Sequence, residues 1–313
     1  MSKIRIAILD SKCIVFPKYN EIEIKLSNKE CQNLHGSMTI QLLDRLVQNN
    51  KFFVYEIMNS NGSTSMKILY ETLIKLLEEK IDIIHMSLSI RNESLHEQVY
   101  LREIMDICSC LKNQGKVIVC STQNRQYCSY PAALDTVIGV RGSILKQNHL
   151  YGYCNKKKIQ MITNYNPILC KINENKMFFG GNSQAATIAT SIIINFLKNK
   201  GKDIDLEKCL YENASFKIWE DKMVLFDNIN KTMGLEKNFI EPSIEKYIKE
   251  NYKLQEIYNK DGIANKKYEK IYFGIIEWLE KKYQLEYNNI YFFDFNNIYT
   301  ISQAFAERWV NLK

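Results

Sequence analysis

The sequence predicts an α/β fold, a parallel sheet with helices on both faces, followed by a small all-α carboxyl-terminal domain. In the first two hundred of its 313 residues, short apolar runs alternate with stretches whose apolar residues recur at helical spacing. Strands that are apolar throughout are typical of parallel sheets, because helices cover both faces of such sheets. After about residue 200 the strand signals stop, and a chain rich in Lys, Glu, Asn and Tyr keeps only helical periodicity.

The pattern predicts five strands and four helices in the first part of the chain. The strands are expected at Ile4–Leu9, Phe52–Ile57, Ile83–Leu88, Val117–Cys120 and Thr136–Val140. The helices are expected at Met38–Val47, Ser65–Glu79, Leu95–Leu111 and Ala185–Leu197. The chain thus divides into a domain at residues 1–199, a connecting segment at 200–238 and a helical domain at 239–313.

Composition is that of a globular protein, with 46% hydrophobic and 25% charged residues. The opening MSKIRIAILD lacks the pattern of a signal peptide, and no apolar run reaches the roughly 18 residues of a membrane span. We therefore expect a cytoplasmic protein without a membrane partner. The nine cysteines are irregularly spaced and form no CxxC pair, which favours reduced thiols over a zinc site.

Basic residues are concentrated in the first part of the chain. Residues 1–199 carry 24 basic and 16 acidic side chains, a balance of +8, whereas residues 200–313 have a balance of −1. No nucleic-acid-binding motif accompanies this charge, so we expect no nucleic-acid partner. A solvated basic face is the simpler interpretation, and attraction of an acidic peptide substrate is the functional one.

Three segments supply the groups that nucleophilic serine catalysis needs. Asp10 ends the first strand, where a parallel sheet places its chemistry. His35 precedes a helix in NLHGSMT, and Ser183 follows two glycines at the start of a helix in FFGGNSQAATIAT. Taken singly, these residues are typical of a turn, a loop and a helix cap. Their order and their matching elements favour catalysis.

The local sequences resemble those of subtilisin-like serine proteases, which share the chain order Asp, His, Ser. The resemblance covers residues 4–197 and has six motifs in order. AILDSK resembles the Asp-Ser/Thr-Gly segment, LHGSMT the His-Gly-Thr segment, IIHMSLS the substrate-binding Ser-Leu-Gly strand, VIVCSTQN the Ala-Ala-Gly-Asn segment, YPAALDTVIGV the Tyr-Pro-Ala strand, and GGNSQAA the Gly-Thr-Ser-Met-Ala-Ala segment. The chain departs from these motifs at Lys12, Ser89, Ile90, Gln123, Asn182 and Thr187.

The resemblance implies a role for each matching residue. Ser183 would be the nucleophile, His35 the general base and Asp10 the residue that orients His35. Asn124 would stabilise the oxyanion together with the Ser183 backbone amide. The backbone of Ser87, Leu88 and Ser89 would pair with an extended substrate. No metal and no cofactor is implied, and His85, on a buried strand, is expected to be a core residue.

Residues 239–313 resemble an acyl or peptidyl carrier protein, with three helical stretches and the phrase LEKKYQLE at the end of the long one. The residue that should carry the phosphopantetheine arm is Glu269 rather than a serine, so we expect no arm. A generic helical appendage is an equal alternative. Either would serve to dock a partner or to stabilise the chain.

Together these features predict a serine endopeptidase with a specific task. An intact triad with unusual flanking residues suggests a cytoplasmic maturation protease that cleaves a precursor peptide or a partner protein. The carrier-like domain would fit a peptide natural-product pathway. The alternative from another class is a diverged binding or scaffolding protein with the same fold and little activity.

Overall fold

The computed structural model describes the chain over the ranges 3–90, 97–123, 129–143, 145, 150–164, 168–173 and 175–219, with eight further residues between 246 and 282. The chain divides into two compact units. The first comprises Met1–Tyr165 and Cys170–Met223, and the second comprises Asn166–Leu169 and Val224–Lys313. Most of the predicted helical domain at 239–313, including Glu269, lies outside the described residues, so the carrier resemblance stays a prediction.

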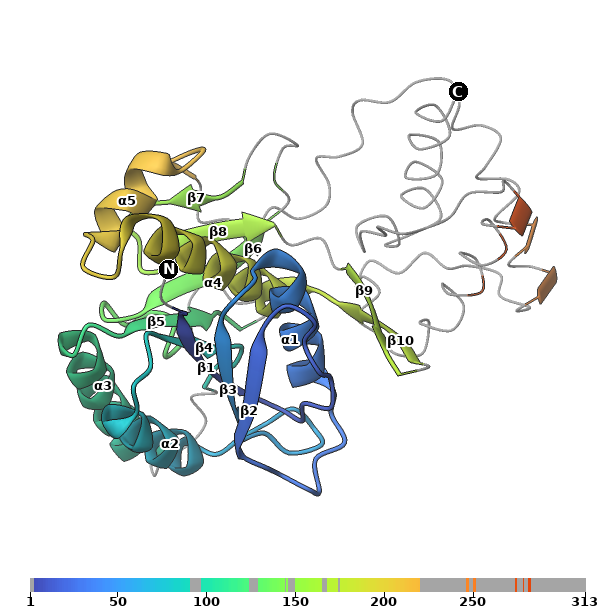
Figure 1. Ribbon diagram of the computed structural model, residues 1–313, viewed down its shortest axis with the longest axis horizontal. Helices are drawn as coiled ribbons and strands as arrows, with labels where there is room; N and C mark the ends of the chain where they lie inside the picture. Colours follow the sequence, from blue (N-terminus) through green and yellow to red (C-terminus); the bar gives the residue numbers. More distant parts are fainter. Residues whose placement is uncertain are drawn as a thin grey trace. The chain divides into compact units, whose positions relative to one another are not determined.

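The first unit is built on an eight-stranded sheet, in the order β2-β3-β1-β4-β5-β6-β8-β7 (Figure 1). Its strands are β1 (Arg5–Asp10), β2 (Glu21–Leu26), β3 (Lys51–Glu56), β4 (Ile83–Met86), β5 (Val117–Ser121), β6 (Ile138–Ser143), β7 (Gly152–Tyr153) and β8 (Met161–Asn164). Neighbouring strands are parallel except β7, which runs antiparallel to β8. A further pair, β9 (Ile168–Ile172) and β10 (Asn175–Phe179), forms a separate ribbon.

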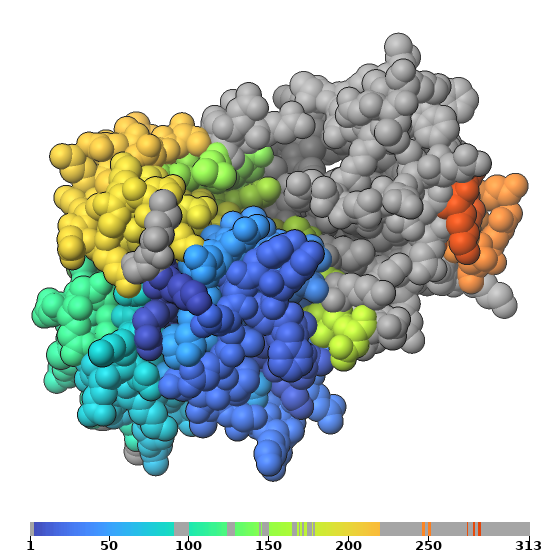
Figure 2. All heavy atoms as spheres, viewed as in Figure 1, coloured from blue at the N-terminus to red at the C-terminus, as the bar shows by residue number. Residues whose placement is uncertain are grey.

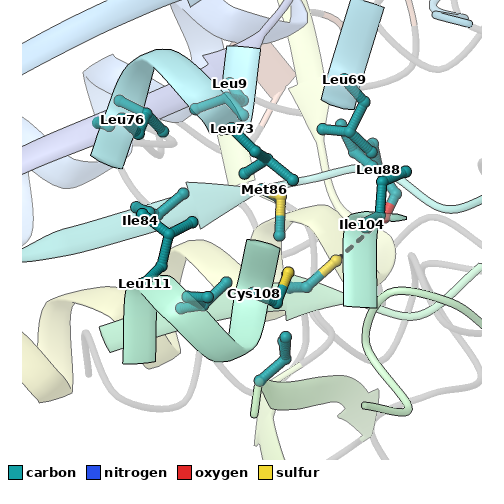
Figure 3. Close-up of a cluster of buried hydrophobic side chains, with 14 of the residues drawn as sticks. Leu9, Leu69, Leu73, Leu76, Ile84, Met86, Leu88, Ile104, Cys108 and Leu111 are labelled. Carbon is teal, nitrogen blue, oxygen red and sulfur yellow. Dashed lines mark hydrogen bonds between the residues drawn. The ribbon is translucent and has the colours of Figure 1, made fainter. Parts of the chain in front are cut away.

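Helices cover both faces of the sheet, as the α/β prediction requires. The helices are α1 (His35–Leu46), α2 (Met66–Glu78), α3 (Glu97–Asn113), α4 (Gly181–Lys200) and α5 (Leu206–Asn213). One core cluster lies between the sheet and the pair α2 and α3, and some of its buried side chains are drawn in Figure 3. A second cluster lies between the other face and α1, α4 and α5. The predicted parallel sheet with two helical layers is therefore confirmed.

The side-chain pattern explains these layers. Successive side chains of β1 point to opposite faces of the sheet. Ala7 and Leu9 therefore belong to the first cluster, and Ile6 and Ile8 belong to the second. All four are fully buried, which explains why residues 6–9 form a continuous apolar run. Figure 2 shows one face on which the blue amino-terminal segments adjoin the yellow region of α4, in agreement with the packing of α1 against α4.

The sequence predicted the central elements and missed the peripheral ones. Strand β2 was not predicted, although EIEIKL alternates strictly between charged and apolar residues. Such alternation is typical of a half-exposed strand, and β2 lies at the edge of the sheet. The short strands β7 to β10 and helix α5 were also missed. Helix α5 lies within the predicted connecting segment at 200–238, and its Leu210 is buried in the second core cluster.

Two properties of the described residues bear on the sequence expectations. Among them, no helix combines the length and apolar character that crossing a bilayer requires. The eight cysteines in this part of the chain are all free thiols.

Ile104 and Met105 allow the first core cluster to be tested with neighbouring substitutions on α3. Ile104 is fully buried in that cluster, whereas the side chain of Met105 is 43% exposed. Ile104→Ala removes three buried carbon atoms and should lower the free energy of unfolding by about 2–5 kcal/mol. Met105→Ala should change it by no more than about 0.5 kcal/mol. Urea denaturation measures both, and equal losses would contradict the assigned packing.

Candidate active site

Asp10 is a buried carboxylate at the carboxyl end of the central strand β1. Its side chain is fully buried, and each of its oxygens accepts hydrogen bonds. Oδ1 accepts from the Ser11 backbone N–H at 2.6 Å, and Oδ2 accepts from the Thr39 hydroxyl at 3.1 Å. The Nδ1 atom of His35 lies 2.8 Å from Oδ1 and 3.0 Å from Oδ2. The structure thus brings together two of the three predicted catalytic residues.

The start of helix α1 places His35 beside Asp10. The His35 backbone N–H donates to Asn33 Oδ1 at 2.9 Å, and the Gly36 N–H donates to Ser11 Oγ at 2.9 Å. A Cβ atom on Gly36 would lie only 2.5 Å from the Ser11 carbonyl oxygen. Only glycine therefore allows the helix start to approach the segment after Asp10 so closely. Gly36 thus permits a close backbone turn beside the imidazole of His35.

The surroundings of His35 prepare its second ring nitrogen for proton transfer. Burial alone would lower the pKa of His35, but the adjacent Asp10 carboxylate outweighs it and raises that pKa above its usual value. Burial would raise the pKa of Asp10, and its contacts with His35 and Ser11 lower it overall. Because Nδ1 faces a carboxylate, it carries the proton in the neutral ring. Nε2 then holds the lone pair that a general base needs.

Phe179, the last residue of β10, covers one side of the imidazole. The two ring centroids are 5.2 Å apart in an edge-on arrangement, and Phe179 is almost fully buried. The His35 side chain remains 24% exposed, so it is accessible from the remaining side. Phe179 also precedes Ser183 by four residues, which ties the chain segment of the predicted nucleophile to the ring of the predicted base.

Ser183 lies in the first turn of α4 and is half-buried. Gly181 opens the helix with φ of 72°, in the left-handed region that favours glycine. Ala185 and Ala186 are fully buried in the second core cluster, so their small side chains let this turn pack closely on the sheet. The free N–H groups of a first helical turn can bind a negative charge.

The third contact expected in the predicted triad is a hydrogen bond between Ser183 and His35. Among the described residues, no hydrogen bond joins the Ser183 hydroxyl to the His35 imidazole. The Ser183 carbonyl oxygen instead accepts from Thr187 Oγ1 at 2.9 Å and from Ser87 Oγ at 3.5 Å. Catalytic hydrogen bonds are often long before a substrate binds, so this arrangement is compatible with the predicted role.

The predicted substrate segment follows β4. Ser87 and Leu88 are buried, and the Leu88 side chain belongs to the first core cluster. Ser89 is half-buried. The Ile90 N–H donates to the Tyr130 carbonyl oxygen at 2.8 Å, so a substrate strand cannot use it. Ser87 to Ser89 remain the part of this segment that could pair with a peptide.

The predicted oxyanion residue Asn124 lies outside the described residues, which resume at Ser129. The two residues before it are both hydrogen-bonded through their backbone N–H groups. The Thr122 N–H donates to the Val140 carbonyl oxygen at 2.9 Å, and the Gln123 N–H donates to Ser129 Oγ at 2.8 Å. The approach to Asn124 is therefore held by two hydrogen bonds.

His85 has a structural role, as expected from the sequence. It is fully buried, its Nδ1 lies 2.8 Å from Thr190 Oγ1, and its Nε2 lies 2.9 Å from Ser87 Oγ. Burial lowers the pKa of His85 to about 4, so the ring is neutral at pH 7. The bond to Thr190 connects β4 to α4, and the bond to Ser87 holds the residue that follows β4. Within the described residues, no cluster of His, Cys, Asp or Glu could hold a metal ion.

Sequence reasoning missed the residues that support the site. Thr39 lies one helical turn after His35, a spacing that could have identified it as a partner of Asp10. The contacts of Phe179 and Asn182 join segments far apart in the chain and have no local sequence signal. Asn182, noted only as a departure from the motif, makes hydrogen bonds to three residues outside its helix.

Comparison with known proteins shows which solved structures have a similar fold. No family model matches the chain, and no curated protein matches it. The solved structure of Sphericase is similar with a TM-score of 0.53 and 15% identity, over 67% of this chain and 83% of that one. The structure of the prenylagaramide maturation protease PagA is similar with a TM-score of 0.50 and 15% identity, over 66% of this chain and 80% of that one. The fold of this chain is therefore subtilisin-like.

His85 should make the folded state less stable as the pH falls from about 6.5 to 4. Its pKa is near 6.5 in the unfolded chain and about 4 in the folded one, so the unfolded state binds more protons in this window. The loss attributable to His85 is about 3 kcal/mol. His85→Asn should flatten the pH dependence of the free energy of unfolding across that window. Ser191→Ala, a buried change on α4 without a titrating group, should leave the slope unchanged.

Proposed function

We propose that the chain is a serine endopeptidase with Asp10, His35 and Ser183 as its catalytic residues. The observation that carries this proposal is the buried Asp10 carboxylate bonded to His35 Nδ1, which leaves Nε2 free to act as a base. The subtilisin-like fold supports it, because the chain order and the elements of these residues are those of the resemblance.

The reaction would proceed in two steps. Ser183 Oγ attacks the carbonyl carbon of the scissile bond while His35 Nε2 takes its proton, and Asp10 stabilises the resulting imidazolium. His35 then gives the proton to the leaving amine, and an acyl-enzyme ester forms on Ser183. Water hydrolyses this ester in the same manner, with His35 again acting as base. The oxyanion would be stabilised by the Ser183 backbone N–H and the Asn124 side chain.

The substrate would lie extended along Ser87, Leu88 and Ser89 and would be a peptide or a protein. We propose a maturation protease, which cuts a precursor peptide or partner protein at few sites. The likeness to a structure named as a maturation protease supports this choice. The balance of +8 in residues 1–199 favours acidic substrates. Residues 239–313 would dock a partner or stabilise the chain, and the protein would act in the cytoplasm without a cofactor.

A binding or scaffolding protein with the same fold is the second candidate. The described side chains of Ser183 and His35 share no hydrogen bond. This favours the binding protein, because a site without catalytic activity does not need such a bond. The bonded Asp10–His35 pair favours the protease, since a buried carboxylate and its imidazole serve no evident purpose in binding a partner.

Ser183→Ala should separate the two candidates. A serine-directed fluorophosphonate probe should label the wild-type chain, with the added mass on Ser183. Ser183→Ala should abolish labelling, and proteolysis should fall by about a million-fold. Ser191→Ala removes another hydroxyl from α4 and should label like wild type. Absence of labelling in the wild type would favour the binding protein.

The labelling rate should rise with pH through the pKa of His35. The base must be neutral to take the Ser183 proton, and the Asp10 carboxylate raises the pKa of His35 above 6.5. The acid limb should therefore lie above pH 6.5. Asp10→Asn removes the carboxylate, so burial should dominate and move the limb to lower pH, while the rate falls by about ten-thousand-fold. An unchanged limb in Asp10→Asn would show that another group controls the rate.

A further inference from the structure

The side chain of Asn182, next to the proposed nucleophile, connects three separate parts of the site. We propose that Asn182 is a positioning residue that holds the segment leading to Asn124 in register with Ser183, an inference that rests on the proposed function. The resemblance predicts threonine at this position, so this role belongs to the present chain.

The Asn182 amide makes hydrogen bonds with both of its ends. Oδ1 accepts from the Gly142 N–H at 2.9 Å. Nδ2 lies 2.9 Å from Thr122 Oγ1, 3.1 Å from the Thr122 carbonyl oxygen and 3.2 Å from the Gln123 carbonyl oxygen. The residue is only 5% exposed, so water cannot easily replace these partners.

These contacts join the start of α4 to the ends of two neighbouring strands. Thr122 and Gln123 directly follow β5, and Gly142 lies near the end of β6. Ser183 is the next residue after Asn182. One buried amide therefore sets the distance between the nucleophile and the chain that precedes the oxyanion residue.

The hydrogen bond to Gln123 also bears on Asn124, because the two residues share a peptide unit. The Gln123 carbonyl oxygen belongs to the same planar peptide unit as the Asn124 nitrogen and Cα atoms. A hydrogen bond to this oxygen therefore limits rotation of the peptide unit that joins Gln123 to the next residue. Oxyanion donors act only when they are held where the negative charge develops.

Only a side chain that donates and accepts at once can make all these bonds. Aspartate has nearly the same shape, but its carboxylate cannot donate and would face the carbonyl oxygens of Thr122 and Gln123. Threonine can donate a single proton from a shorter side chain. The three residue types therefore provide a graded test.

The experiment compares fluorophosphonate labelling of Asn182→Asp, Asn182→Thr and wild type at a series of probe concentrations. Asn182→Asp should lower the maximum labelling rate by about a hundred- to a thousand-fold, as loss of an oxyanion donor does, with little change in the half-saturating concentration. Asn182→Thr should give an intermediate rate. Thermal unfolding shows whether each variant is folded.

Asn50→Asp is the matched control. Asn50 is fully buried, and its Nδ2 donates to Asn20 Oδ1 at 2.8 Å and to the Gln48 carbonyl oxygen at 3.0 Å. It precedes β3, at the amino ends of the strands, away from the site. The same chemical change should therefore destabilise the fold there without slowing the labelling of Ser183.

Each result distinguishes the inference from the proposed function. If the wild-type chain is labelled and Asn182→Asp is labelled as fast as Asn50→Asp, the inference is wrong and the proposed function stands. The same holds if the loss lies only in the half-saturating concentration, or if Asn182→Thr labels like wild type when Asn182→Asp does not fold. A wild-type chain without labelling overturns the proposed function and this role with it.

Discussion

The burial of the Asp10 carboxylate is the constraint on which the candidate site depends. A charge without access to water is costly unless hydrogen bonds and an opposite charge stabilise it. Here the partners are the Ser11 N–H, the Thr39 hydroxyl and His35. Two of these partners lie on α1, so the helix must begin beside the end of β1. Gly36, which touches the Ser11 carbonyl, makes that approach possible.

A second set of polar contacts fixes the other side of the site in the same way. Helix α4 packs on the sheet through Ala185 and Ala186, while His85 and Asn182 bond it to the strand ends. Such buried polar groups specify one arrangement, because sliding the helix would leave several of them without partners. The start of α4, and Ser183 with it, is therefore set by long-range contacts and not by the local helix signal.

The difference between local signals and long-range contacts explains what could be predicted from the sequence. Strand β1 and Asp10 at its end were predictable, because continuous apolar runs indicate central strands and parallel sheets place polar groups at their carboxyl ends. Strand β2 was missed because it alternates and lies at the edge. The distance between Ser183 and His35 could not be predicted, and neither could the contacts of Asn182, since Thr122 is sixty residues away in the chain.

The two buried histidines show how one carboxylate can serve a reaction and leave a neighbour inert. Asp10 raises the pKa of both rings, yet the pKa of His35 ends above 6.5 and that of His85 at about 4. The difference lies in contact: His35 is bonded to the carboxylate, whereas His85 feels it only through space and is bonded to two hydroxyl groups. Direct bonding outweighs burial, and a distant charge does not. His85 thus stays neutral and can anchor α4 while His35 changes its protonation state, so proton transfer at the site need not disturb the helix that carries Ser183.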